Sequence, residues 1–134
     1  MAALQAPRNT VKLNDNKKLE PPVKAGALIF QGSLVGAQAG LAVPAGPDAD
    51  VILGRADFGA DNRGGADGAV RVEVMRGVYA WENDVAAPVT LALLGQNVFA
   101  VDDQTVSASD GAGTRPVAGK LYQIDSDGVW VETV

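Results

Sequence analysis

Short apolar runs, each bordered on at least one side by glycine, proline or aspartate, constrain this chain more than any other feature. The clearest of them lie at residues 27–30, 51–56, 97–101, 119–125 and 129–132. Runs of this length with Gly and Asp between them are typical of strands and tight turns, and no stretch has the apolar spacing of a long helix. About eight to ten strands at this spacing predict an all-β fold: a small antiparallel barrel or sandwich, tulip-like or jelly-roll-like.

Local patterns within this fold make more specific predictions. The clearest strand is predicted over residues 70–81, where valine occupies positions 70, 72 and 74 and alternates with Arg71, Glu73 and Met75, so that one face is buried. Gly77 interrupts that alternation and predicts a β-bulge. Hairpins are predicted between residues 97–101 and 105–107, and between residues 119–125 and 129–132. Residues 90–94 fit either one helical turn ended by Gly95 or a strand.

The first 24 residues differ from the rest in charge. They carry five basic and two acidic side chains, a balance of +3, whereas residues 25–134 carry six basic and fourteen acidic, a balance of −8. They contain Pro7, Pro21 and Pro22 and no helical stripe. We therefore expect an extended N-terminal arm over residues 1–24 and a β-barrel or sandwich body over residues 25–134. A basic arm suits an acidic partner, and a solvated tail is the alternative.

The 134 residues include no cysteine and no histidine, which excludes several classes of site. Disulfides, metal sites built on Cys or His, thiol catalysis and imidazole triads all need those residues. We therefore expect no catalytic residue, no metal and no cofactor. The acidic body disfavours nucleic acid as a partner, because phosphate contacts need a basic surface. No apolar run reaches the roughly 20 residues of a membrane helix, so no membrane partner is expected either.

The chain has 22 Ala and 18 Val among its apolar residues, so its core is expected to be thin. Each buried Val or Leu contributes only about 1.5–3 kcal/mol, and association with other copies would add stability. The N-terminus lacks the apolar core of a signal peptide, and the cysteine-free composition fits synthesis in a reducing cytoplasm.

The remaining candidate sites each have a simpler interpretation. Residues 113–120 approach a phosphate-binding loop but have the wrong glycine spacing and no hydroxyl residue after the lysine. Asp102 and Asp103, and the stretch 125–128, offer carboxylates to calcium, although Asp-Gly is also a strong hairpin signal. Trp81 beside Glu82 is the nearest approach to a glycan-cleaving pair, and a core tryptophan explains it equally well. The serines lack a neighbouring base, and the aromatic residues look too dispersed to form a base-stacking platform.

Six stretches, in order over nearly the whole chain, carry a family resemblance. They are APRNT at 6–10, GRA at 54–56, RGV at 76–78, AVDDQTV at 100–106, DGAGTR at 110–115 and DSDGVWV at 125–131. Together they resemble the small capsid decoration, or cement, proteins of tailed bacteriophages. The resemblance implies a mostly β body that oligomerises on the outside of an HK97-type shell, with an arm that lies on the capsid or pairs with a neighbour.

The same resemblance assigns part of the arm to binding. It transfers Pro7, Arg8, Asn9 and Thr10 to the arm, and the alternation of apolar and polar residues extends it through Val11, Lys12 and Leu13. The expected function is structural: the protein clamps neighbouring major capsid subunits on the outer surface of the virion. The expected partners are the major capsid protein and other copies of the chain, as a trimer or a dimer.

Two other functions remain open from the sequence. One is a phage tail, fibre or host-surface module that binds carbohydrate, which would need exposed aromatic residues gathered on one cluster of loops. The other is a small hydrolase that uses a pair of carboxylates.

Overall fold

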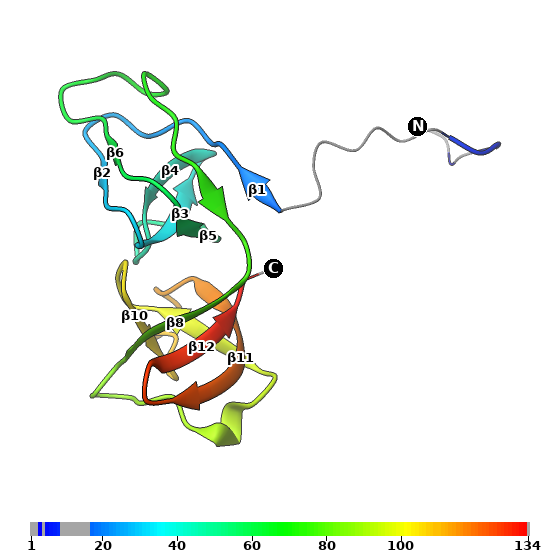
Figure 1. Cartoon of the computed structure of the whole chain (residues 1–134), viewed down its shortest axis with the longest axis vertical. Coiled ribbons are helices and arrows are strands. Elements are labelled where there is room, and N and C mark those ends of the chain that lie inside the picture. Colours follow the sequence, from blue (N-terminus) through cyan, green and yellow to red (C-terminus); the bar gives the residue numbers. More distant parts are fainter. Residues whose placement is uncertain (1–2, 4, 9–16, 134) are drawn as a thin grey trace.

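The computed structural model describes residues 3, 5–8 and 17–133, and its regular structure is almost entirely strands. Figure 1 shows two lobes stacked along the long axis. We call residues 17–76 the N-terminal lobe and residues 77–133 the C-terminal barrel. The all-β prediction is confirmed. Among the described residues the single helical element is η1, one 3₁₀ turn at Leu91–Leu93, which settles the ambiguity at residues 90–94.

The N-terminal lobe contains seven short strands. They are β1 (Lys18–Leu19), β2 (Leu28–Ile29), β3 (Leu34–Gln38), β4 (Leu41–Pro44), β5 (Val51–Ala56), β6 (Ala60–Asp61) and β7 (Val74–Met75). Five of them form an antiparallel sheet in the order β1-β7-β5-β3-β4, and β2 pairs with β6 in a separate two-stranded ribbon. The sheet and the ribbon enclose one small apolar core.

Residues 21–24 close this lobe. Pro22 bridges to Arg71, and Val23 forms a parallel bridge with Ala42 of β4. The Lys24 N–H donates to the Ala42 carbonyl at 3.0 Å, and the Ala42 N–H donates to the Pro22 carbonyl at 2.7 Å. The segment therefore ties β4 to the chain that leads into β7, and Val23 is completely buried.

Regular pairing thus begins well before residue 25, where the body was expected to start. Lys18 pairs with Met75 and Leu19 with Val74. Prolines and lysines made residues 18–24 look like part of the arm, but a proline can occupy a strand position where its missing N–H is not needed.

The C-terminal barrel contains the other five strands. They are β8 (Val78–Asn83), β9 (Asn97–Ala100), β10 (Thr105–Ser107), β11 (Val117–Asp125) and β12 (Gly128–Glu132), closed in the order β10-β8-β12-β11-β9. Both predicted hairpins are confirmed as the pairs β9–β10 and β11–β12. Neighbouring strands are antiparallel except β8 and β10, which run parallel with Thr105 opposite Glu82.

The bulge predicted at Gly77 is wrong. β7 belongs to the sheet of the N-terminal lobe and β8 belongs to the barrel, so the chain changes sheets at this residue. The alternation before it is real, because Val72 and Val74 are fully buried on one face. The phase is lost afterwards because the strand ends and a new one begins.

The two lobes share part of their packing. The N-terminal core is built around Val23, Ile29, Val35, Ala42, Ala56, Val72 and Val74. The barrel core also takes in Leu34, Val43, Ala45, Ala49 and Ile52 of the N-terminal lobe. Leu34 and Val35 are consecutive in β3 and enter different cores, because successive side chains of a strand point to opposite faces. β3 is therefore the wall between the two cores.

Candidate functional site

The predicted arm residues lie mostly outside the described part of the chain. Pro7 and Arg8 are described and exposed. Asn9, Thr10, Val11, Lys12 and Leu13 fall outside the described residues. The structure describes the segment that joins the arm to the body. We call residues 17–24, which include β1, the root of the arm.

The root of the arm is basic and held by ion pairs. Lys18 pairs with Glu20 at 3.3 Å and with Glu73 of the strand region beside it. Hydrogen bonding to Glu73, and then to Glu20, raises the pKa of Lys18 above its ordinary value. A hollow of about 330 Å³ lies at this point, lined by Lys17, Lys18, Leu19 and Arg76. The root thus combines strand pairing with three basic side chains, of which Lys17 is exposed and Lys18 is paired with two glutamates.

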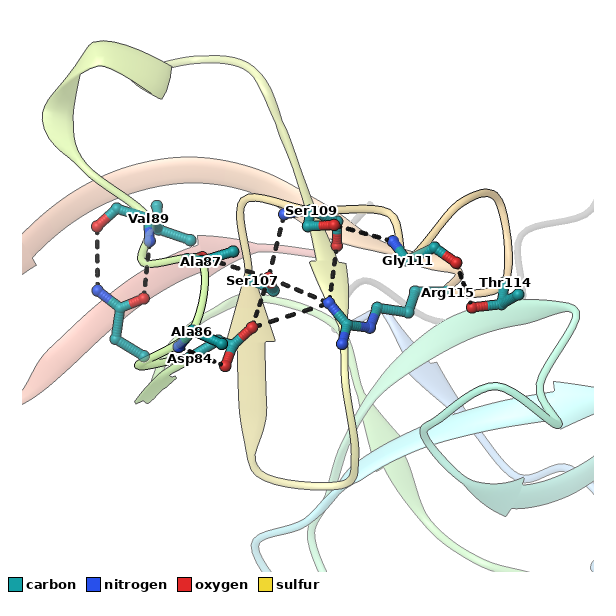
Figure 2. Close-up of polar contacts among 10 residues, drawn as sticks. Asp84, Ala86, Ala87, Val89, Ser107, Ser109, Gly111, Thr114 and Arg115 are labelled. Atoms are coloured by element: carbon teal, nitrogen blue, oxygen red, sulfur yellow. Dashed lines mark hydrogen bonds and ion pairs between the residues drawn. The ribbon is translucent and has the colours of Figure 1, made fainter.

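A serine with a carboxylate partner lies in the barrel, although no base neighbours it in sequence. The Ser107 hydroxyl donates to Asp84 Oδ2 at 2.9 Å, and Arg115 reaches both Ser107 and the carbonyl of Ser109 (Figure 2). The Ser107 hydroxyl and the Ala86 N–H hold the pKa of Asp84 below its ordinary value. A carboxylate so stabilised is a weak base, and Ser107 is completely buried, so a substrate cannot reach it. These hydrogen bonds hold the loop after β8 against the loop after β10.

The other acidic candidates serve as acceptors in turns. Asp102 Oδ1 accepts the Gln104 N–H at 2.9 Å, which fixes the turn between β9 and β10. Asp125 Oδ1 accepts the Trp130 indole N–H and the Asp127 N–H, each at 2.9 Å, and these bonds lower the pKa of Asp125. Among the described residues there is no group of three acidic side chains placed to hold a metal ion. Trp81 is buried in the barrel core, as the structural interpretation of that residue predicted.

The structure places two exposed aromatic residues, which look dispersed in the sequence, at the same end of one two-stranded ribbon. Phe30 and Phe58 are 62% and 60% exposed. In the β2–β6 ribbon Ile29 lies opposite Ala60, so both phenylalanines fall at the same end of that ribbon. Their common position depends on the long-range pairing of β2 with β6. Each of these strands has two residues, so neither the local pattern nor the spacing in the sequence predicts the pairing.

A hollow of about 330 Å³ lies beside Phe30, between the two lobes' loops. It is lined by Phe30, Gln31, Gly32, Ser33, Asp103 and Gln104. The Leu34 N–H donates to the Asp103 carbonyl at 2.8 Å, which holds the two walls of the hollow together. Burial, and the neighbouring charge of Asp102, raise the pKa of Asp103.

Comparisons with protein-family models, with curated proteins and with solved structures found no match to this chain. No helix among the described residues has the length and apolar character needed to cross a membrane.

Proposed function

We propose that this chain is a capsid decoration protein of a tailed bacteriophage. It binds the outer surface of an HK97-type head and clamps neighbouring major capsid subunits, which stabilises the expanded shell. The supporting observation is the way the N-terminal segment is rooted. Residues 18–24 pair with β7 on one side and with β4 on the other, and Val23 is completely buried between them.

A root that is paired on both sides suits a protein that clamps its neighbours, because it can transmit force from the arm to the core. A pull on the arm from a neighbouring subunit passes through the Lys18–Met75 and Leu19–Val74 pairs into the core of the lobe. A tail attached only by a flexible linker would transmit no such load. Because many copies bind at repeated positions on a shell, a modest affinity for each copy gives a large total stabilisation.

The charge distribution supports the same role. Residues 1–24 carry +3 and residues 25–134 carry −8, so arm and body favour different surfaces. The arm suits an acidic or strand-edge surface on the major capsid protein or on another copy of the chain.

The test is a deletion that stops short of the root. Removal of residues 2–16 spares β1, and we expect it to leave the unfolding midpoint unchanged while occupancy on purified, undecorated expanded heads falls to background. A variant with residues 2–16 replaced by a Gly/Ser linker of equal length separates the arm's sequence from its length. Failure of the full-length protein to bind heads would overturn the proposed function. Undiminished occupancy of the deletion variant would overturn the role of the arm alone.

A host-surface module that binds carbohydrate is the second candidate. It is favoured by Phe30 and Phe58, which are exposed at one end of the β2–β6 ribbon as such a module requires. Binding to intact cells or tails in preference to heads would select it.

A further inference from the structure

We propose that the hollow lined by Phe30, Gln31, Asp103 and Gln104 accepts an arginine side chain of a partner protein. This is a contact of the body, separate from the arm. It goes beyond the proposed function, because it specifies the chemistry of the group received by the body whichever protein supplies it.

The hollow is built by two tight turns that are fixed relative to each other. On one wall, the Ser33 N–H donates to the Phe30 carbonyl at 3.2 Å across a turn in which Gly32 has a φ of +83°. On the other wall, the Val101 N–H donates to the Thr105 carbonyl at 2.9 Å and closes the hairpin that carries Asp103. Since both walls are already ordered, a ligand would not have to arrange them, and that lowers the cost of binding.

One charged group in the hollow has no ion pair. Asp103 lines the hollow, is half-buried and forms no ion pair within the described part of the chain. Its carboxylate accepts a hydrogen bond from its own backbone N–H, and burial raises its pKa. A cation bound beside it would favour the ionised form and offset that desolvation.

Arg55, whose strand position lies opposite Leu34, is engaged elsewhere. It pairs with Asp57 at 2.9 Å and lies over the Tyr79 ring at 4.6 Å. The negative charge of Asp103 is therefore left for a partner.

Arginine suits this set of groups better than other cations. Its planar guanidinium has five N–H donors in a fixed fork, and two of them can donate parallel hydrogen bonds to the Asp103 carboxylate. A guanidinium also stacks on an aromatic face such as that of Phe30. Phe30 lines the hollow and is 62% exposed, which indicates a protein partner, because anchors of protein interfaces combine aromatic burial with such a charged contact.

The test is an NMR titration of the full-length protein with two matched peptides. One is acetyl-Leu-Arg-Leu-amide, and the other carries citrulline, a neutral analogue of nearly the same shape. We expect saturable shifts of the Gly32, Ser33, Asp103 and Gln104 amide signals with the arginine peptide, and about tenfold or greater weakening with citrulline or in Asp103→Asn. Asp110→Asn, which removes an exposed carboxylate from a different loop, should bind as the wild type does.

The peptide comparison keeps the test independent of whether any variant folds. Equal shifts with both peptides, no saturable shift, or unchanged affinity in Asp103→Asn would each overturn the arginine site. Saturable shifts of the same amides with a neutral trisaccharide, in place of the arginine peptide, would also overturn it and would favour a glycan ligand. The titration uses no phage heads, so failure of the capsid role leaves its outcome interpretable.

Discussion

The N-terminal lobe and the C-terminal barrel are both small β structures, but they close in different ways. In the barrel every strand pairs with two neighbours, so the backbone ladder itself completes the ring. The N-terminal lobe is completed by two single bridges and by one buried side chain, Asn62. Asn62 Nδ2 donates to the carbonyls of Val23 at 3.0 Å, Lys24 at 3.1 Å and Ala66 at 2.9 Å.

This difference in closure indicates which lobe opens more readily by local unfolding. A ring closed by strand pairing distributes its closure over many hydrogen bonds, whereas the open sheet of the N-terminal lobe depends on two single bridges and on the amide of one side chain. We therefore expect the N-terminal lobe to open locally at lower free energy than the barrel. The proposed arm root and one wall of the proposed arginine site both belong to this weaker lobe.

The largest expected effect is in the barrel, at Gly119. Its φ is +154°, and a Cβ at this position would collide with the carbonyl oxygen of Glu132. Gly119→Val should cost about 3–4 kcal/mol of unfolding free energy, because the β11–β12 ladder would have to separate. Urea denaturation measures it.

Gly95→Val is the matched control for Gly119. Gly95 has a φ of +78° but open space around the missing Cβ, so this substitution carries backbone strain alone, about 1–2 kcal/mol. Equal losses at the two glycines would show that close strand approach does not limit the barrel.

The next largest effect is expected from the loss of the Asn62 side-chain amide in the N-terminal lobe. Asn62→Ala removes the side-chain hydrogen bonds to three carbonyls, each of which keeps a backbone N–H donor, and should cost about 2–3 kcal/mol at roughly 1 kcal/mol for each bond. Hydrogen exchange should show lost protection at the Val23 and Ala42 amides, with barrel amides unaffected. The exposed Asn97→Ala serves as control. Uniform loss of protection over both lobes would contradict separate closure.

A smaller effect is expected at the contact between the lobes. Arg55 belongs to β5 of the N-terminal lobe, and its guanidinium lies 4.6 Å from the centre of the Tyr79 ring in β8. Arg55→Met should cost about 0.5–1 kcal/mol and broaden the thermal transition, because the lobes would unfold less cooperatively. Arg63→Met, which removes the exposed pair with Asp61, is the control. A transition that keeps its width would show that the shared core alone couples the lobes.

The smallest effect at neutral pH concerns Asp84 in the barrel. Its pKa is lower in the folded protein than the ordinary 3.8. The ionised form therefore stabilises the fold above about pH 4, and this contribution is lost as the pH falls through the folded pKa. Asp84→Asn should give a flatter dependence of unfolding free energy on pH between 4 and 2, measured by urea titration at each pH. The exposed Asp110→Asn is the control, and an unchanged acid slope in Asp84→Asn would contradict the assignment.

Much of the barrel was predictable because its signals are local. The pairs β9–β10 and β11–β12 join residues close in sequence across Asp-rich turns, so alternation and turn residues suffice to predict them. The parallel pair β8–β10 was not predictable, since it joins strands separated by another strand and a long loop. The Asp84–Ser107 contact depends on that pairing, so it was missed as well.

The sequence by itself determined that this chain is a cysteine-free and histidine-free β protein, with glycine and aspartate at its turns and opposite charge at its two ends. Tertiary structure alone decided that Val23 enters a core, that Asn62 bonds across a lobe, and that Phe30 and Phe58 flank the same end of a ribbon. The physical reason is the range of the interactions. Turn conformation and strand alternation depend on neighbours along the chain, whereas closure of a ring depends on residues about 20 to 50 positions apart, whose pairing lowers the free energy only once the whole sheet has formed.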